Sequence, residues 1–146
     1  MQVVDLNNVE TLPRGEGLEV AFPVSSATGT AATAIVWIEL DAGGSVPEHR
    51  DSAEELLFVV RGEIEASVGG ETGVLGEGQL AVVPAMSPHS MRNVGEGDAR
   101  VLGFFAGSTS VATFSEPMGP EGEQIFVIGA PRFLGAPLEE AVTLTA

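Results

Sequence analysis

Short apolar segments separated by glycine-containing turns restrict this chain to folds that are built from many short strands. The segments are rich in Val, Ile, Phe and Thr, several alternate apolar with polar residues, and sustained helical periodicity is hard to find. The segments that predict strands are residues 19–24, 30–40, 54–60, 63–68, 73–75, 79–83, 89–94, 100–106 and 124–128. Strands at roughly 8–12 residue spacing with turn signals between them predict an all-β sandwich or barrel.

The chain has the length of one domain, and we predict a single domain over residues 1–146. Its barrel core is expected at about residues 30–107, followed by an extension, residues 108–146, that packs on the barrel or on a partner chain. Residues 108–123 hold two prolines and few sustained apolar runs, so no strand is predicted there. Residues 137–142 fit either one helical turn or a tail exchanged between two copies.

The charge balance excludes several classes of partner. The chain has 21 acidic residues, six arginines and a formal net charge of −15. Such a charge repels nucleic acid and anionic membranes, and it attracts divalent cations everywhere, so it is no evidence for a specific metal site. There is no cysteine, which excludes disulfides and zinc–thiolate sites. Because no signal peptide or apolar stretch of membrane-spanning length is found, we expect a cytoplasmic protein.

The two histidines of the chain each lie in a glycine-framed segment suited to metal binding. In the first segment, His49 and Asp51 are two residues apart and share one face of a strand. Glu55 begins the apolar run 56–60, where an unpaired inward carboxylate would be unfavourable and a cation would offset that cost. In the second segment, a loop bracketed by two prolines leads to His89. Together the segments supply a set of three or four ligands.

Two imidazoles with one carboxylate can hold Fe(II) and leave positions open for substrate and oxygen. Zinc, manganese and nickel accept the same ligands, so the residues alone do not select the metal.

The two segments resemble the two motifs of the cupin superfamily. The first motif is matched by Gly43, His49, Asp51, Glu55 and Gly62, and the second by Gly78, Pro84, Met86, His89 and Asn93. All ten positions have the family's spacing, and eight of them have the family's residue type. Asp51 stands where the family usually has its second histidine, and Met86 stands where it has a glycine. The resemblance is to small single-domain cupins of the cupin-2 type.

This resemblance implies a double-stranded β-helix, or jelly-roll, barrel with an internal ligand cavity. It further implies one divalent transition metal per chain (Fe, Mn, Ni or Zn), held by His49, Asp51, Glu55 and His89. Glu55 is expected to act either as a ligand or as a catalytic base. The expected partners are a small organic molecule and a second copy of the chain in a homodimer.

Three functions follow as expectations from the same ligands. The first is a dioxygenase-like enzyme that acts on an oxygen-bearing substrate such as a diketone, flavonol or phenolic. The second is a metal-dependent isomerase, cyclase or lyase that needs no oxygen. The third is a non-catalytic cupin that binds or senses a small ligand.

The residues around the motifs carry further expectations. Met86 and Met91 are candidates to line the pocket, with the Met86 loop on a path that differs from the family's and Met86 directed into the barrel mouth. Arg50 is expected to face solvent, and Asn93 to hold a turn. Four aromatic residues are expected in the core: Trp37, Phe58, Phe104 and Phe105.

Overall fold

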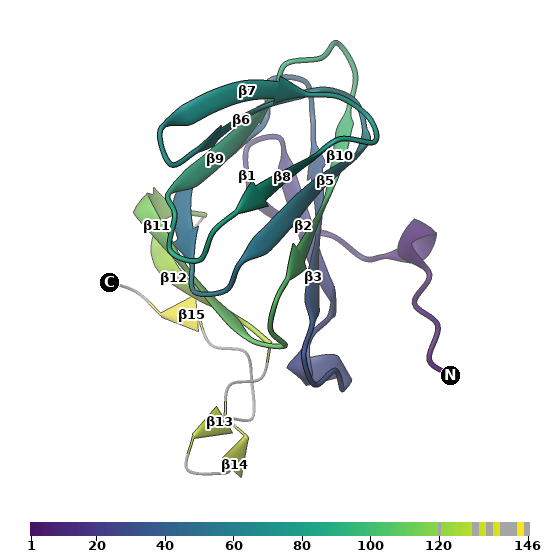
Figure 1. Cartoon of the computed structure of the whole chain (residues 1–146), viewed down its shortest axis with the longest axis vertical. Coiled ribbons are helices and arrows are strands. Elements are labelled where there is room, and N and C mark those ends of the chain that lie inside the picture. The colour runs from purple at the N-terminus through teal and green to yellow at the C-terminus, as the bar shows by residue number, and fades with distance from the viewer. Residues whose placement is uncertain (120, 130–131, 134–135, 138–142, 145–146) are drawn as a thin grey trace.

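Two antiparallel sheets face each other in the computed structural model, which describes residues 1–119, 121–129, 132–133, 136–137 and 143–144 (Figure 1). One sheet has the order β1 (Leu12–Gly15), β2 (Leu18–Val24), β3 (Ala34–Leu40), β10 (Ala99–Phe105), β5 (Glu55–Arg61), β8 (Leu80–Val83). The other has the order β15 (Thr143–Leu144), β12 (Glu123–Ile128), β11 (Ser110–Met118), β4 (Ser45–Asp51), β9 (His89–Asn93), β6 (Ile64–Val68), β7 (Glu71–Leu75). The prediction of an all-β jelly-roll fold is confirmed.

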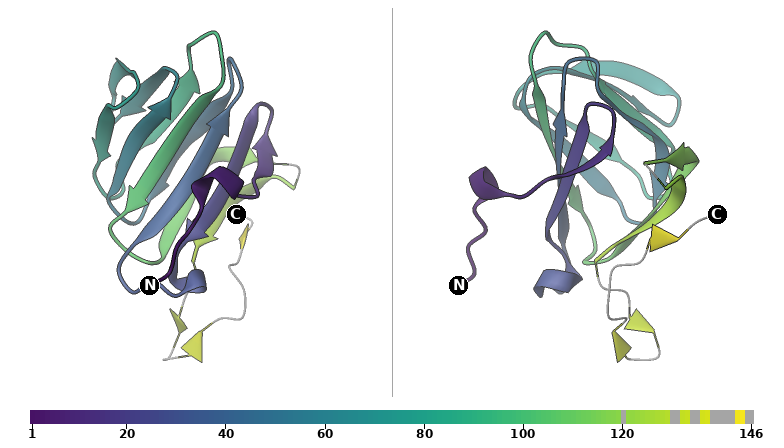
Figure 2. Two further views of the ribbon diagram at one scale, coloured as in Figure 1. Left: turned by 90° about the vertical axis from the view of Figure 1, so that its right-hand side faces the viewer. Right: turned by 180° about the vertical axis from the view of Figure 1, so that it is seen from behind.

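The remaining described elements are short. Two 3₁₀ helices, η1 (Leu6–Asn8) and η2 (Ser26–Thr28), precede β3, and the strands β13 (Arg132–Phe133) and β14 (Ala136–Pro137) form a separate pair. Figure 2 shows the strands of one sheet lying obliquely side by side. Among the described residues, no helix has the length and apolar character needed to cross a membrane.

The core lies between the sheets because inward residues alternate along each strand. On β5, Glu55, Leu57 and Val59 are buried, whereas Leu56 and Phe58 are only partly buried on the opposite face. Side chains also alternate between the two faces of β10, where Val101 and Phe105 point into the core. The core is therefore one apolar layer shared by the two sheets, as expected for a sandwich.

A second, smaller apolar cluster lies on the outer face of the six-stranded sheet. Trp37, Ala21 and Leu102 are buried there, and Leu6 and Val9 from the N-terminal segment pack against them. Trp37 is thus buried outside the barrel core. This cluster joins the N-terminal segment to the sheet.

The four predicted core aromatics divide between these environments. Phe105 is in the core, and Trp37 and Phe58 belong to the outer cluster. The prediction for Phe104 is wrong, because its side chain is 40% exposed. It points out of β10, away from the inward-facing Phe105.

Residues 108–123 contain a long strand, β11, so the prediction of no strand in that range is wrong, whereas the strand predicted at 124–128 corresponds to β12. In β11, Ser110, Ala112 and Phe114 alternate inward, and Ala112 and Phe114 pair with Asp51 and His49 of β4. β11 therefore forms a wall of the barrel beside the candidate metal ligands. The predicted helical turn or exchanged tail at 137–142 falls largely outside the described residues.

Candidate metal centre

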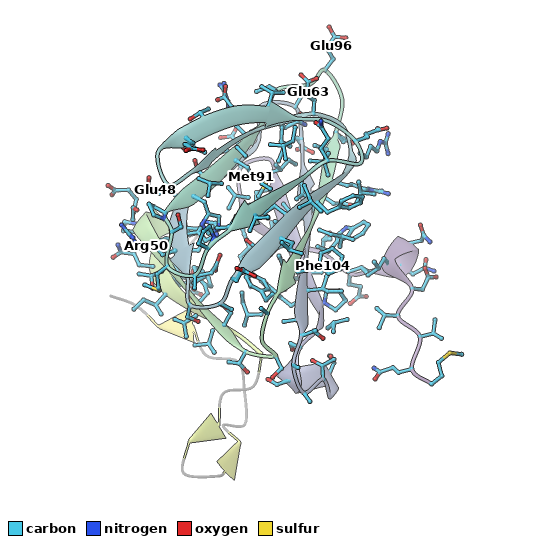
Figure 3. All side chains as sticks on the ribbon, in the orientation of Figure 1. Glu48, Arg50, Glu63, Met91, Glu96 and Phe104 are labelled. Carbon is cyan, nitrogen blue, oxygen red and sulfur yellow. The ribbon has the colours of Figure 1, made fainter. Side chains whose placement is uncertain are left out.

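Strands β4, β9 and β5 bring the four predicted site residues together. His49 and Asp51 alternate inward on β4, and His49 pairs directly with His89 at the start of β9. Glu55 begins β5 in the opposite sheet. All four residues are buried. Figure 3 shows their neighbours Glu48 and Arg50 at the outer margin of β4, as the alternation requires.

Both imidazoles are oriented by their own loops. The Nδ1 atom of His49 lies 2.8 Å from the carbonyl oxygen of Pro47, and Nδ1 of His89 lies 2.9 Å from that of Ser87. A carbonyl oxygen only accepts, so each Nδ1 carries the proton and donates it. Each Nε2 then faces the site, which is the orientation in which a histidine ligates a metal.

Three of the four residues form a group whose ligand atoms fit one ion. One ligand atom each from His49, Asp51 and His89 lie within 4.8 Å of one another. Asp51 Oδ2 is 3.4 Å from His49 Nε2 and 3.0 Å from His89 Nε2. The predicted three-ligand core of the site is therefore assembled by adjacent strands.

The contact between Asp51 and His89 lacks the alignment of a hydrogen bond. Asp51 Oδ2 and His89 Nε2 are buried, and neither has a hydrogen-bond partner among the described residues. Two buried acceptor atoms this close are unfavourable unless a cation or a proton lies between them. The residues present thus fit a divalent metal ion, with two imidazoles and one carboxylate as donors.

Glu55 lies at the edge of this group. Its Oε1 is 3.4 Å from His89 Nε2, but Glu55 is not a member of the three-residue group. The carboxylate rests against the backbone of Gly103 on β10, where a Cβ atom would lie 2.2 Å from Glu55 Oε2. Gly103 therefore provides the space for Glu55, and a larger residue there would displace the carboxylate.

The site's electrostatics favour a positive charge. Burial lowers the pKa of His89, but the carboxylates of Asp51 and Glu55 outweigh burial and raise it to about 10. Burial alone would raise the pKa of Asp51, yet the two histidines hold it below its usual value. Burial raises the pKa of Glu55 above its usual value. Without a metal, the position between His89 and the carboxylates is therefore held by a proton.

Metal binding is consequently expected to release a proton. His89 is protonated near neutral pH because its pKa is raised, whereas a metal requires the free Nε2 lone pair. Affinity should then rise by about tenfold per pH unit as pH increases towards 10. Calorimetric titration of the metal-free protein with Zn²⁺ near pH 7, in two buffers with different ionisation enthalpies, measures the release. Equal apparent enthalpies in both buffers would contradict it.

The ring of His49 is held from both sides. Its centroid lies 4.6 Å from that of Phe114 in a stacked arrangement, at an interplanar angle of 20°, and 4.1 Å from that of His89. Phe126 in turn packs edge-on against Phe114. This aromatic support comes from β11 and β12, and the sequence motifs gave no sign of it.

An apolar cavity of about 210 Å³ opens onto the ligands. His49, Asp51 and Glu55 line it together with Met91 and apolar side chains from both sheets. Met91 is buried, as expected for a pocket residue, and Figure 3 shows it inside the outline of the molecule. A mainly apolar wall with a few polar groups suits a small organic ligand.

The Met86 side chain does not point into the barrel mouth as predicted. It is not among the residues that line the cavity, and its side chain is 52% exposed. Its φ of 64° is the left-handed conformation that glycine adopts easily, so the loop makes the left-handed turn without glycine. The backbone N–H of Met86 donates to the carbonyl of Asp51 at 2.8 Å, which ties this loop to the ligand strand.

Arg50 and Asn93 behave as predicted. The Arg50 side chain is exposed, and its Nη1 donates to the carbonyl of Met86 at 2.9 Å. The Asn93 side chain is buried and joins two turns: its Nδ2 donates to the carbonyls of Leu40, Asp41 and Gly97, and its Oδ1 accepts from the N–H of Gly95.

Two facing antiparallel sheets, with two imidazoles and a carboxylate converging beside an internal cavity, define a small barrel protein with a candidate metal site. Residues 36–105 match the Cupin_2 family, described as "Cupin domain". The chain belongs to the cupin superfamily, as a single small cupin domain.

Known proteins similar to this chain include a curated relative and several solved structures. Polyketide synthase CurC of Streptomyces cyaneus is 31% identical over 106 residues, which cover 69% of this chain and 66% of that protein. The structure of KdgF from Halomonas sp. has a TM-score of 0.65 at 19% identity, covering 73% of this chain and 94% of that one. The polyketide cyclase RemF from Streptomyces resistomycificus has a TM-score of 0.62 at 19% identity, covering 72% of this chain and 78% of that one.

Proposed function

We propose that this cupin is a metal-dependent enzyme that acts on a small oxygen-bearing organic substrate. The observation that carries the proposal is the group of His49, Asp51 and His89, of which His49 and Asp51 line an apolar cavity, with an orphaned pair of buried polar atoms at its centre. Two imidazoles and one carboxylate leave coordination positions open. When bound, the metal would act as a Lewis acid and polarise a substrate oxygen.

The residues around the ion have separate roles in this proposal. His49, Asp51 and His89 hold the metal, while Glu55 completes the ligand set or moves a proton to and from the substrate. Burial raises the pKa of Glu55, and the side chain lines the cavity, so it is placed to exchange a proton with a bound molecule. The apolar walls exclude water from the substrate.

The first candidate reaction is oxygen-dependent cleavage of a diketone or phenolic. It is supported by the composition of the ligand set, because two histidines and one carboxylate are typical of Fe(II) oxygenases.

The second candidate is an oxygen-independent cyclisation or isomerisation. Such a reaction needs a proton-transfer group beside a polarised carbonyl, and we assign this role to Glu55, which lines the cavity and whose Oε1 lies 3.4 Å from His89 Nε2. The likeness to polyketide synthase CurC and the polyketide cyclase RemF also supports it.

One experiment separates these candidates. The purified protein, reloaded with Fe(II), Mn, Ni or Zn, is incubated with acetylacetone and with catechol, in air and under nitrogen. Oxygen uptake with a product seen only in air supports the dioxygenase, whereas a product formed equally under nitrogen supports the second reaction. Binding of these compounds without turnover would favour a non-catalytic binding cupin. Failure of the wild-type protein to retain any of the metals would contradict the metal-dependent function itself.

We also propose that the chain forms a homodimer through the outer face of β8, β5 and β10. Val60, Leu80, Val82 and Phe104 are exposed there, and the outward positions of these strands carry no acidic side chain. In a chain with a net charge of −15, a face without carboxylates is where a second copy meets the least repulsion. A two-fold axis would pair this face with itself.

The dimer is tested by light scattering after size exclusion. Wild type is expected at twice the chain mass of 15.0 kDa, and the double variant Leu80→Arg/Phe104→Arg at the chain mass itself. Val74→Arg is the control, because Val74 is exposed on β7 in the other sheet. A monomeric wild type, or a double variant that stays dimeric, would contradict the proposed interface.

A further inference from the structure

One basic side chain reaches the cavity that contains the candidate metal ligands. Arg14, on the edge strand β1, is half-buried and lines this cavity together with His49, Asp51 and Glu55. Among the described residues it is the only arginine that does so. The other ionisable residues that line the cavity are His49, Asp51 and Glu55, and all three lie at the metal end.

The Arg14 guanidinium has no carboxylate partner among the described residues. Its one hydrogen bond is long, from Nη1 to the carbonyl of the adjacent Pro13 at 3.4 Å. In contrast, Arg92 and Arg100 each form an ion pair with a glutamate. In a chain with 21 acidic residues, an arginine that lines an apolar cavity and is left unpaired is available to an anionic ligand.

Strand register places Arg14 away from the metal ligands. Pro13 pairs with Glu19, which pairs with Glu39, whereas Glu55 lies level with Phe105 and Ala34. Five residues along β3 separate the two levels, roughly 16 Å at about 3.3 Å per residue. Side chains extend into the cavity from both levels, so a ligand that joins them is shorter than this. Arg14 therefore meets the far end of a ligand.

The charges in the cavity indicate what that far end carries. The carboxylates of Asp51 and Glu55 together balance the charge of a divalent ion, so no carboxylate of the cavity wall is left to compensate the charge of Arg14. We infer that the substrate is an elongated organic acid whose oxygen atoms reach the metal, whose apolar body fills the cavity, and whose carboxylate binds Arg14. The inference rests on the proposed function, because the metal provides the first contact.

The test uses dihydrocaffeate and its methyl ester as probes. Both carry the same catechol for the metal and the same apolar body, and only the acid carries a carboxylate for Arg14. The Zn²⁺-loaded wild-type protein is expected to bind the acid at least about tenfold more tightly than the ester in calorimetric titrations. Arg14→Gln should abolish this preference without changing the zinc content. Arg14→Lys should retain part of it.

Arg61→Gln is the matched control, because it removes the same charge from an exposed position outside the cavity. It should leave the preference for the acid unchanged. An equal affinity of wild type for acid and ester, or a preference that survives in Arg14→Gln, would overturn the inference while the metal site stands. Absence of zinc from the wild-type protein after loading would instead overturn the proposed function on which the inference rests.

Discussion

Replacing His89 with alanine is expected to lower zinc affinity by more than about 100-fold. This is more than the roughly 10–100-fold loss in metal affinity that is typical when a residue contacting a ligand, and not the ligand itself, is replaced. His89 is fully buried, and its Nε2 lies 3.0 Å from Asp51 Oδ2 and 3.4 Å from Glu55 Oε1. Its removal leaves two buried carboxylates and a single imidazole, which is a poor site for a transition metal. Metal content after equilibrium dialysis, measured by mass spectrometry, gives the result directly.

Two further variants control for this substitution. Ser90→Ala changes the next residue of β9, which faces the other side of the strand, and should retain zinc. Asp51→Asn keeps the size of a ligand and removes its charge, so it tests the same site if His89→Ala does not fold. Full zinc retention by both His89→Ala and Asp51→Asn would show that these residues do not hold the metal.

Replacing Asn93 with alanine is expected to reduce the free energy of unfolding by about 3 kcal/mol. The buried side chain makes four hydrogen bonds to backbone groups, each of which contributes on the order of 1 kcal/mol, and their loss leaves buried carbonyls without a donor. For a domain of this length, the melting temperature should fall by roughly 10 °C. Urea denaturation followed by circular dichroism measures the change.

The control for Asn93 is Asn7→Ala, since Asn7 is exposed in η1 and contacts only Asp5. That change should stay within about 0.5 kcal/mol. Asn93→Asp removes the Nδ2 donor and places a carboxylate among three carbonyl oxygens, so it should be at least as destabilising as alanine. A similar stability for Asn93→Ala and Asn7→Ala would contradict the role of Asn93 as the link between two turns.

The strands that the sequence predicted well contain a sustained apolar run, as in residues 56–60, or begin within one of the two motifs. The predicted strand 89–94 corresponds to β9, and 54–60 corresponds to β5 with a shift of one residue at each end. β11 escaped prediction because its apolar residues do not form a sustained run: Thr113 and Ser115 interrupt them, and Pro117 lies within the strand. Its pairing with β4 joins segments about sixty residues apart, and local pattern carries no information about that contact.

The candidate site could be predicted to the extent that it lies within the two motifs. The motif spacing places His49 and Asp51 on one face of a strand, and His89 reaches them because β9 pairs with β4. Phe114, Gly103 and Arg14 lie outside the motifs and approach the site only through sheet pairing. The predicted direction of Met86 was wrong because the loop was expected to leave the family's path, whereas Met86 adopts the left-handed φ of 64° that glycine adopts easily.

The outer apolar cluster determines what intrinsic fluorescence can report on this protein. Trp37 is the sole tryptophan and the chain has no tyrosine, so emission arises from one position. That position lies under Leu6 and Val9, with Arg100 5.7 Å from the ring centroid, and not beside the cavity. A red shift would therefore report exposure of this outer cluster, as on release of the N-terminal segment or on unfolding of the sheet. Spectroscopic studies of metal binding need a reporter other than the native indole.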